Sequence, residues 1–231
     1  MKRPLCLVAI AAIAPQAHAA FSTYFGEDLG AFSTGLLTNT RVAQSAFWSD
    51  AGTDATYGFE DLAPLRRAPF TFTSAAGSPG EVTTLVTGNP RVQVSNGTAG
   101  GTFATDGSQF LRISSPIDRA IIFNIFRPVA AIGFTLTDLG DTGNSLDAVV
   151  AFESGATERI SIPTSTGVDG SAAFFGLVAD GTDLVTNLTL EYTSPGLSDA
   201  FGLDELTVAV PTPGTLAIAG LGLMASARRR R

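Results

Sequence analysis

The chain has 231 residues and a formal net charge of −7, and Lys2, Cys6 and His18 are the only residues of their types. All three precede residue 20, so a chain processed at that point has no imidazole and no thiol. Such a chain cannot use Ser-His-Asp or Cys-His catalysis, the usual zinc ligands or a disulfide. Between residues 20 and 210, eight basic residues against 21 acidic ones leave a formal charge of −13, which repels nucleic acid and anionic lipid and attracts cations.

The first 19 residues have the pattern of a secretory signal peptide. Lys2 and Arg3 form a positive start, residues 5–14 form an apolar core, and a small-x-small cleavage site ends at Ala19. A retained membrane helix is the alternative, but the apolar run is about half of the roughly 20 residues that a span needs. We therefore expect signal peptidase to cut between Ala19 and Ala20 and the rest of the chain to be exported.

Residues 20–57 differ in pattern from the longer region after them, and we expect them to form an N-terminal helical or irregular segment. The polar residues 38–40 can cap a helix over residues 41–49, with Val42, Ala46 and Phe47 on one face. We expect this helix to pack on the neighbouring sheet domain.

Short apolar runs separated by Gly, Asp, Asn and Pro predict an all-β domain over residues 58–209. The expected strands are residues 69–73, 81–87, 91–95, 109–114, 120–126, 130–137, 147–153, 159–163, 172–178, 184–192 and 202–210. Pro128 should end the strand 120–126, because proline cannot donate a hydrogen bond in a central ladder. Strands in this number, with no convincing interior helix, predict a two-sheet antiparallel sandwich of the jelly-roll kind.

Residues 210–231 form a linker, an apolar run and an arginine cluster. The linker contains Val210, Pro211 and Pro213, which can neither continue a strand nor enter a helix. Residues 214–227 are then apolar or small, and the last four residues are Arg228, Arg229, Arg230 and Arg231. This pattern predicts a short transmembrane anchor helix with a cytoplasmic stop. A disordered tail is the alternative, but such tails do not usually pair an apolar run with an arginine block.

The tail resembles the PEP-CTERM sorting signal, which exported proteins of Gram-negative bacteria that make extracellular polysaccharide carry. The resemblance lies in the order of Val-Pro-x-Pro, an apolar helix with Gly-Leu-Gly-Leu, and the arginines, with Thr212 in place of the glutamate of the motif's name. It implies recognition in the inner membrane by an exosortase, cleavage near the prolines and delivery to the cell surface or beyond.

The part of the chain before the tail also resembles a recurrent group of PEP-CTERM proteins. The stretches that carry this resemblance are YFGED (24–28), GFED (58–61), VAAIGFTLTDLGD (129–141), AFFG (173–176) and DAFGLDEL (199–206). Their order along the chain implies a shared fold and destination, and it implies no particular activity.

The remaining candidates for site chemistry are carboxylates. Asp138 and Asp141 lie in a Gly-rich turn and are a weak candidate for a glycosidase acid pair, so we expect no enzymatic activity. The Gly-Phe-Glu and Leu-Asp-Glu-Leu segments resemble carbohydrate-binding jelly rolls in which acids on the first and last strands bind one structural calcium. The resemblance implies that Glu60 and Asp204 converge on calcium, the candidate cofactor; alternatively, Asp204 is a strand-end residue that faces solvent.

The sequence leaves two functions open. The first is a structural or interaction protein of the cell surface or the polysaccharide matrix, and the second is a calcium-dependent carbohydrate-binding module. Sugar-binding modules usually present flat Trp or Tyr platforms. Here Trp48 lies in the expected helix, Tyr57 and Tyr192 are isolated, and the sixteen Phe residues mostly occupy core-like positions. The sequence therefore favours the first function, with polysaccharide as a candidate partner.

Overall fold

The structure is a computed structural model that describes residues 20–32, 37–53, 55–75, 81–88, 92–98, 100–115, 119–140, 142–164, 168–180, 183–193 and 199–210. The expected signal peptide and the sorting tail from Pro211 onward lie outside the described residues.

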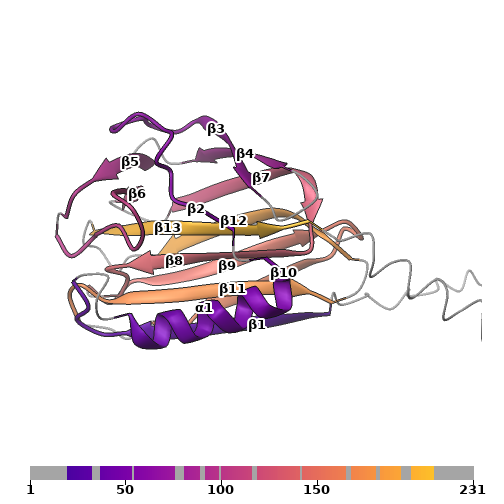
Figure 1. Cartoon of the computed structure of the whole chain (residues 1–231), viewed down its shortest axis with the longest axis horizontal. Coiled ribbons are helices and arrows are strands. Elements are labelled where there is room, and N and C mark those ends of the chain that lie inside the picture. Colours follow the sequence, from indigo (N-terminus) through magenta and orange to yellow (C-terminus); the bar gives the residue numbers. More distant parts are fainter. Residues whose placement is uncertain are drawn as a thin grey trace, which may run out of the picture.

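Two antiparallel sheets face each other and confirm the predicted jelly-roll-like sandwich (Figure 1). Sheet A has the order β1-β11-β8-β13-β6-β5, with β2 also paired to β13, and sheet B has the order β10-β9-β12-β7-β4-β3. The strands of sheet A are β1 (Phe21–Asp28), β2 (Thr56–Tyr57), β5 (Val92–Asn96), β6 (Gln109–Ser115), β8 (Ala131–Thr137), β11 (Ala172–Ala179) and β13 (Asp199–Ala209). Those of sheet B are β3 (Phe70–Ala75), β4 (Glu81–Gly88), β7 (Arg119–Val129), β9 (Ser145–Phe152), β10 (Thr157–Ile162) and β12 (Val185–Thr193).

The main core lies between the two sheets. Side chains that alternate along each strand fill it, among them Leu111 and Phe134 from sheet A and Phe123, Val150 and Leu190 from sheet B, all fully buried. The prediction that most Phe residues occupy core positions is confirmed for the described part of the chain. Its exposed Phe side chains are Phe25, Phe32 and Phe126.

The N-terminal segment is not wholly helical or irregular, contrary to the prediction. Phe21–Asp28 forms β1, which pairs with β11 along its whole length, and Thr56–Tyr57 forms β2 beside β13. The sandwich therefore begins at residue 21 rather than at residue 58. The prediction was wrong because β1 is an edge strand whose Gly26 and polar residues hide the alternation on which strand assignment depends.

Pro128 does not end its strand, contrary to the prediction. β7 continues to Val129, because the register with β12 shifts between the pairs Asn124–Asn187 and Val129–Val185. The pairing with β4 ends at Ile125. Pro128 therefore lies in a stretch where the missing N–H costs no ladder hydrogen bond.

The helix α1 (Thr38–Ala51) is longer than the predicted 41–49 and is capped differently. Its first turn donates to a neighbouring strand instead of to residues 38–40: the N–H of Asn39 and of Thr40 reach the Asp28 carboxylate at 3.0 and 2.8 Å. Desolvation raises the pKa of Asp28, but these donors outweigh it and hold that pKa below its usual value. Asp28 thus stabilises the start of α1 from the end of β1.

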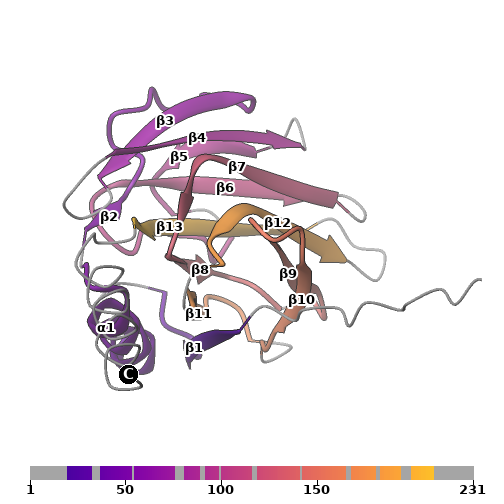
Figure 2. The ribbon, with the colours of Figure 1, turned by 90° about the vertical axis from the view of Figure 1, so that its right-hand side faces the viewer.

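The expected buried face of α1 was only partly correct. The helix buries Thr40, Ala43, Gln44 and Phe47, whereas the side chain of Val42 is 67% exposed. The buried face lies on the outer side of sheet A, over β1, β11 and β8, as Figure 2 shows from the side.

Three glycines of sheet A make room for this helix. A Cβ on Gly26 would lie 2.3 Å from the carbonyl oxygen of Asn39, and a Cβ on Gly133 or Gly176 would lie 3.0 or 2.6 Å from the ring of Phe47. Such distances are too short for a side chain, so these glycines allow α1 to approach the sheet closely. The glycines of YFGED, of IGF and of AFFG therefore serve helix packing.

Ala20 and Val210 lie at the same end of the sandwich. Consecutive backbone hydrogen bonds join Asp180 to Ala20, Ala179 to Ala130, and Ala130 to Ala209 across the ends of four neighbouring strands. The tail beyond Val210 therefore leaves from the end at which the mature chain is expected to start. Within the described ranges, no helix is long and apolar enough to cross a membrane.

Candidate functional site

The two acids predicted to bind metal lie on either side of Gly58, between β2 and the loop of residues 100–108. A Cβ on Gly58 would lie 3.7 Å from Oδ1 of Asp204 and 3.9 Å from Cγ of Glu60. Glu60 comes just after β2, and β2 pairs with β13, which contains Asp204. The first strand of the fold is β1, at the far edge of sheet A and not beside β13, so it is the short strand β2 that brings Glu60 near Asp204.

Asp204 is buried and anchors the loop of residues 100–108. Its Oδ2 accepts hydrogen bonds from the N–H of Thr105 and of Asp106 at 2.8 and 3.1 Å, and its Oδ1 accepts one from the N–H of Glu205 at 2.8 Å. The alternative interpretation, a residue that faces solvent, is wrong, since Asp204 is 1% exposed. Burial, with a smaller contribution from the neighbouring Glu205, raises the pKa of Asp204 to about 7 despite these donors.

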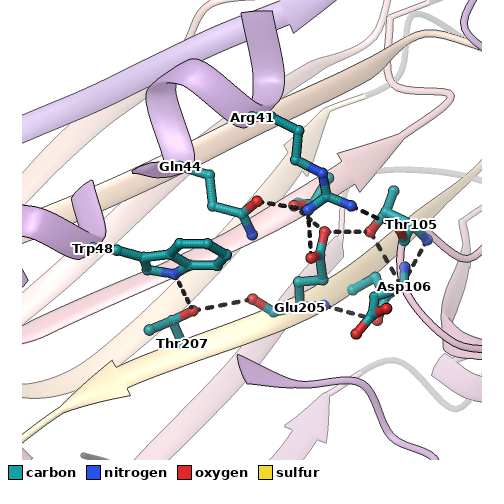
Figure 3. A network of polar contacts seen from close by, with 9 residues as sticks. Arg41, Gln44, Trp48, Thr105, Asp106, Glu205 and Thr207 are labelled. Carbon is teal, nitrogen blue, oxygen red and sulfur yellow. Dashed lines mark hydrogen bonds and ion pairs between the residues drawn. The ribbon is translucent and has the colours of Figure 1, made fainter. Parts of the chain in front are cut away.

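Glu205 is the centre of a second set of polar contacts beneath α1 (Figure 3). It is 4% exposed and has a φ of +51° in the bulge where the register between β13 and β8 shifts. Its Oε2 accepts from the hydroxyls of Thr105 and Thr135 at 2.8 and 3.1 Å. The bulge therefore turns this carboxylate toward the outer face of sheet A, where α1 and the loop cover it.

Arg41 supplies the positive charge of this network. Its Nη1 lies 2.5 Å from Oε1 of Glu205 and donates to Gln44 at 2.6 Å, while its Nη2 donates to the carbonyl of Thr105 at 2.8 Å. One guanidinium thus joins the helix, the last strand and the loop. Trp48 adds a second link from α1, since its indole N–H donates to Thr207 at 3.3 Å.

Glu60 holds the other end of the same loop. Its Oε1 accepts from the N–H of Ser108 and of Gln109 at 2.7 and 2.6 Å, and its Oε2 accepts from the Ser108 hydroxyl at 3.0 Å. Desolvation raises the pKa of Glu60, but the backbone donors outweigh it and keep that pKa below its usual value. Glu60 and Asp204 thus share one task, the anchoring of residues 105–109.

The two acids do not form a multidentate cation site in this geometry. Among the described residues, no three or more His, Cys, Asp or Glu side chains gather where they could hold a metal ion. The carboxylate oxygens of Glu60 and Asp204 accept protein N–H and O–H groups, which occupy lone pairs that a cation would need. Calcium binding by these residues stays a prediction.

Of the weak candidate for a glycosidase acid pair, Asp138 and Asp141, only Asp138 lies in the described part of the chain. Asp138 is buried, has a φ of +62°, and accepts a hydrogen bond from the N–H of Gly170 at 2.8 Å. A Cβ on Gly101 would lie 2.0 Å from its carboxylate, so the loop passes close to this acid as well. Asp141 lies outside the described residues. Asp138 therefore anchors loops at the end of the sandwich opposite Val210.

Two of the surface hollows on the described part of the molecule bear on function. The larger, about 550 Å³, runs along β1 and α1 and is lined by Thr23, Tyr24, Phe25, Gly26, Glu27, Asn39, Val42, Ala43 and Ala46. The smaller, about 280 Å³, lies at the loop end and is lined by Phe32, Thr98, Gly100, Gly101 and Phe103. The Phe32 ring is 54% exposed there.

Sequence patterns did not indicate the roles of Arg41, Glu205 and Thr105. These residues are far apart in the chain, and no spacing links them, because a bulge in β13 and the packing of α1 bring them together. The one available signal was the scarcity of basic residues, with eight between residues 20 and 210. An isolated arginine at the start of a helix that is expected to pack on a sheet invites the search for a buried acidic partner.

Comparison with known proteins identifies the tail. The model of the PEP-CTERM protein-sorting motif matches residues 209–231, so the chain carries this motif and is an exported protein. No curated protein sequence matches the chain.

Several solved β-sandwiches are similar to it. TmCBM61, in complex with beta-1,4-galactotriose, is 15% identical, with 67% of this chain and 94% of that chain covered and a TM-score of 0.42. The family 11 carbohydrate-binding module from Clostridium thermocellum is 10% identical (64% and 97% covered, TM-score 0.32), and the K2 cleaved adhesin domain of Lys-gingipain is 12% identical (68% and 97% covered, TM-score 0.37). Similarity at this level carries no argument about a ligand.

Proposed function

We propose that this exported protein, which carries a PEP-CTERM sorting motif, is a structural or interaction component of the cell surface or of the extracellular polysaccharide matrix. The observation that carries the proposal is the junction between sandwich and tail. The last strand ends at Ala209, the motif begins at residue 209, and Val210 is still buried. An exosortase cut near residues 211–214 would therefore remove the tail and leave every described strand intact.

The tail explains the expected route of the protein. Residues 214–227 give affinity for the inner membrane, and Arg228 to Arg231 hold the end of the chain on the cytoplasmic side. The sandwich would stay at the membrane after signal peptidase has acted at Ala19 and Ala20, and it would reach the surface after the second cut.

The described surface supports an interaction role better than catalysis. The acids singled out in the sequence, Glu60, Asp138 and Asp204, accept hydrogen bonds from loop backbones and thereby hold the fold together. The larger hollow combines a strand edge with the exposed apolar side chains of Phe25 and Val42. Such a combination suits a macromolecular partner more than a small polar substrate.

A second candidate is the calcium-dependent carbohydrate-binding module, and the hollow at the loop end favours it. An exposed Phe32 ring beside the backbone of Gly100 and Gly101 offers an apolar face on which a sugar ring can stack. This hollow lies at the end opposite Val210, so it would point away from the membrane while the tail is in place.

One experiment tests the delivery part of the proposal. Replacing Arg228 to Arg231 with Ser should leave the protein in the membrane uncut or release it without processing, whereas the parent protein should appear at the surface in the shortened form. Fractionation followed by intact-mass analysis measures both outcomes. Identical fractionation and mass for the variant and the parent would contradict the proposal.

A second experiment separates the two candidate functions. The processed protein should be retained by exopolysaccharide of the producing strain if it binds sugar through the loop-end hollow, and Phe32→Ala should then reduce retention by about tenfold. Phe126→Ala is the matched control, since Phe126 is 62% exposed and lies outside this hollow. Retention that both variants leave unchanged would favour the structural role.

A further inference from the structure

The larger hollow lies beside the free edge of sheet A. β1 is the end strand of this sheet, and its only strand partner among the described residues is β11. α1 lies over β1, and Asn39, Val42 and Ala46 project along one side of the hollow. The hollow is therefore a slot between the edge of a strand and the flank of a helix.

The backbone along this edge is open. The carbonyl of Ala20 accepts from the N–H of Asp180, so even-numbered residues of β1 bond to β11 and odd-numbered residues direct their N–H and C=O outward. The outward carbonyl of Glu27 already accepts a hydrogen bond from the Asn39 side chain at 3.1 Å. No described residue meets the outward groups of Thr23 and Phe25, which leaves the edge open from Phe21 to Phe25.

The chemistry of the slot fits an added β-strand. Unpaired backbone groups are satisfied by another extended backbone, and the walls then select side chains. Glu27 is the only charged residue among those that line the slot, and Phe25 and Val42 are 37% and 67% exposed. A strand with small side chains toward α1 and an apolar side chain toward Phe25 would fill it.

We propose that this strand is β1 of a second copy of the same chain, paired antiparallel with Thr23 opposite Thr23. This register uses only the open backbone groups and brings Phe21 of each copy beside Phe25 of the other, a favourable cross-strand aromatic pair. On the helix side, Ala20 and Ser22 of one copy lie opposite Gly26 and Tyr24 of the other, so only small side chains enter the slot beneath Val42 and Ala46.

Two further features agree with self-pairing. Neighbouring strands lie about 4.8 Å apart and α1 lies over β1 and β11, so the two helices would lie within roughly 10 Å, the distance at which helices pack. The second feature is charge: if signal peptidase cuts before Ala20, the free α-amino group of one copy lies next to Glu27 of the other and forms a complementary pair at each end of the interface.

The geometry also fixes when pairing can occur. A two-fold axis at Thr23 makes the copies antiparallel, and Val210 lies at the Ala20 end of each copy, so the two tails are attached at opposite ends of the pair. Both tails cannot then enter the same membrane from one pair. Pairing therefore belongs to copies from which the tail has been cut, and tail removal controls it.

Cysteine cross-linking tests the pairing directly, because Cys6 is the only cysteine and lies in the signal peptide. In the proposed register the two Thr23 Cα atoms lie about 5.5 Å apart, within the disulfide range. Thr23→Cys in the full-length chain should give a covalent dimer on mild oxidation in the processed, released protein and none in the uncut membrane form. Ser45→Cys, on the exposed surface of α1 outside the slot, should give none.

Sedimentation provides an independent measure. Val42→Lys should raise the dissociation constant of the processed protein by about tenfold or more, because it places two charges in the slot, whereas Ser45→Lys should leave it unchanged. Processed protein that stays monomeric at high concentration, or equal cross-linking at residues 23 and 45, would overturn the proposal, and so would dimers that Val42→Lys does not weaken. Surface delivery is measured separately, so its failure would not be confused with a failure to pair.

Discussion

The outer faces of the two sheets are built on opposite principles. In sheet B the strands alternate: in β9, buried residues follow exposed or half-buried ones, and exposed Arg159 bridges Asp147 and Glu191 at 2.8 and 2.6 Å on the solvent side. In sheet A all seven residues of β8 are buried, because the helix and the loop of residues 100–108 cover its outer side. The outer face of sheet A is thus buried like the core between the sheets, and charged groups there depend on specific partners.

The largest expected difference in stability is between variants of Arg41, on the outer face of sheet A, and of Arg159, on the outer face of sheet B. Arg41→Met should lower the free energy of unfolding by about 2 kcal/mol, because it leaves the buried Glu205 without its cation. Removal of one member of a fully buried pair costs about 3–5 kcal/mol, and the Arg41 side chain is 37% exposed. Arg159→Met removes two exposed ion pairs and should have little effect. Urea titrations of both variants measure the difference.

A double variant sharpens this first contrast. Adding Glu205→Gln to Arg41→Met removes the uncompensated charge and should recover part of the lost stability. If Arg41→Met and Arg159→Met cost the same, or if the double variant recovers nothing, the ion pair between Arg41 and Glu205 does not hold the helix to the sheet.

The glycines beneath α1 should give the next largest effect. Gly176→Ala brings a methyl group to 2.6 Å from the Phe47 ring, and such overpacking costs about 1–3 kcal/mol. Ser161→Ala, exposed on β10 of sheet B, is the control and should be close to neutral. Near-ultraviolet circular dichroism would report Trp48 in α1, so a shifted helix would show as a changed spectrum, and an unchanged spectrum with unchanged stability would contradict the packing argument.

Most of the strands could be predicted from the sequence, with β1 and β2 as the exceptions. Short apolar runs separated by Gly, Asp, Asn and Pro predicted the strands from β3 to β13 and the fold class, because strands buried on one or both faces carry apolar residues and end at turn residues. β1 escaped detection because Gly26, needed for the helix, interrupts its pattern. Arg41 and Glu205 escaped because their meeting depends on a bulge with a positive φ, which local periodicity does not encode.

For the acids Glu60 and Asp204, too, the sequence predicted one part of the arrangement and not the other. Glu60 and Asp204 both lie close to Gly58, since β2 and β13 are neighbours, whereas their shared calcium stays a prediction. The sequence could not reveal that the N–H groups of residues 105, 106, 108 and 109 would meet their oxygens, because this depends on the path of a Gly- and Thr-rich loop. Loops of this kind have no periodic signal.

The pH dependence of stability should report the raised pKa of the buried Asp204. The folded state holds the pKa of Asp204 at about 7, above the usual value of 3.8, so the folded protein binds more protons than the unfolded chain between these limits. Stability should therefore fall as pH rises from about 4 to about 7 and should level off above that. Asp28 and Glu60, whose pKa values are lowered, contribute stability that is lost only below their usual range, near pH 4.

Melting temperatures at pH 5 and pH 7.5 measure this slope. The wild-type protein should melt at a higher temperature at pH 5, and Asp204→Asn should flatten the difference, whatever the substitution costs at either pH. Glu158→Gln on sheet B removes a carboxylate outside the cluster and should keep the wild-type slope. A wild-type melt that is independent of pH between 5 and 7.5 would contradict the raised pKa of Asp204.

Calcium should give the smallest effect, and it tests whether the acids of sheet A serve a ligand in addition to the fold. A calcium ion requires six to eight oxygen ligands, so an ion between Glu60 and Asp204 must displace N–H donors from both carboxylates and recruit carbonyls and water. That competition weakens binding, and stabilisation by mass action reaches about 2.7 kcal/mol only at roughly a hundred times the dissociation constant.

We therefore expect millimolar calcium to raise the melting temperature slightly at pH 7.5 and a chelator to reverse the change, with magnesium as the control cation. Asp204→Asn and Glu60→Gln should each remove the response. If calcium and chelator leave the melting temperature of the wild-type protein unchanged, these two carboxylates act only as hydrogen-bond acceptors for the loop of residues 105–109. A carbohydrate-binding function would then not depend on calcium at this site.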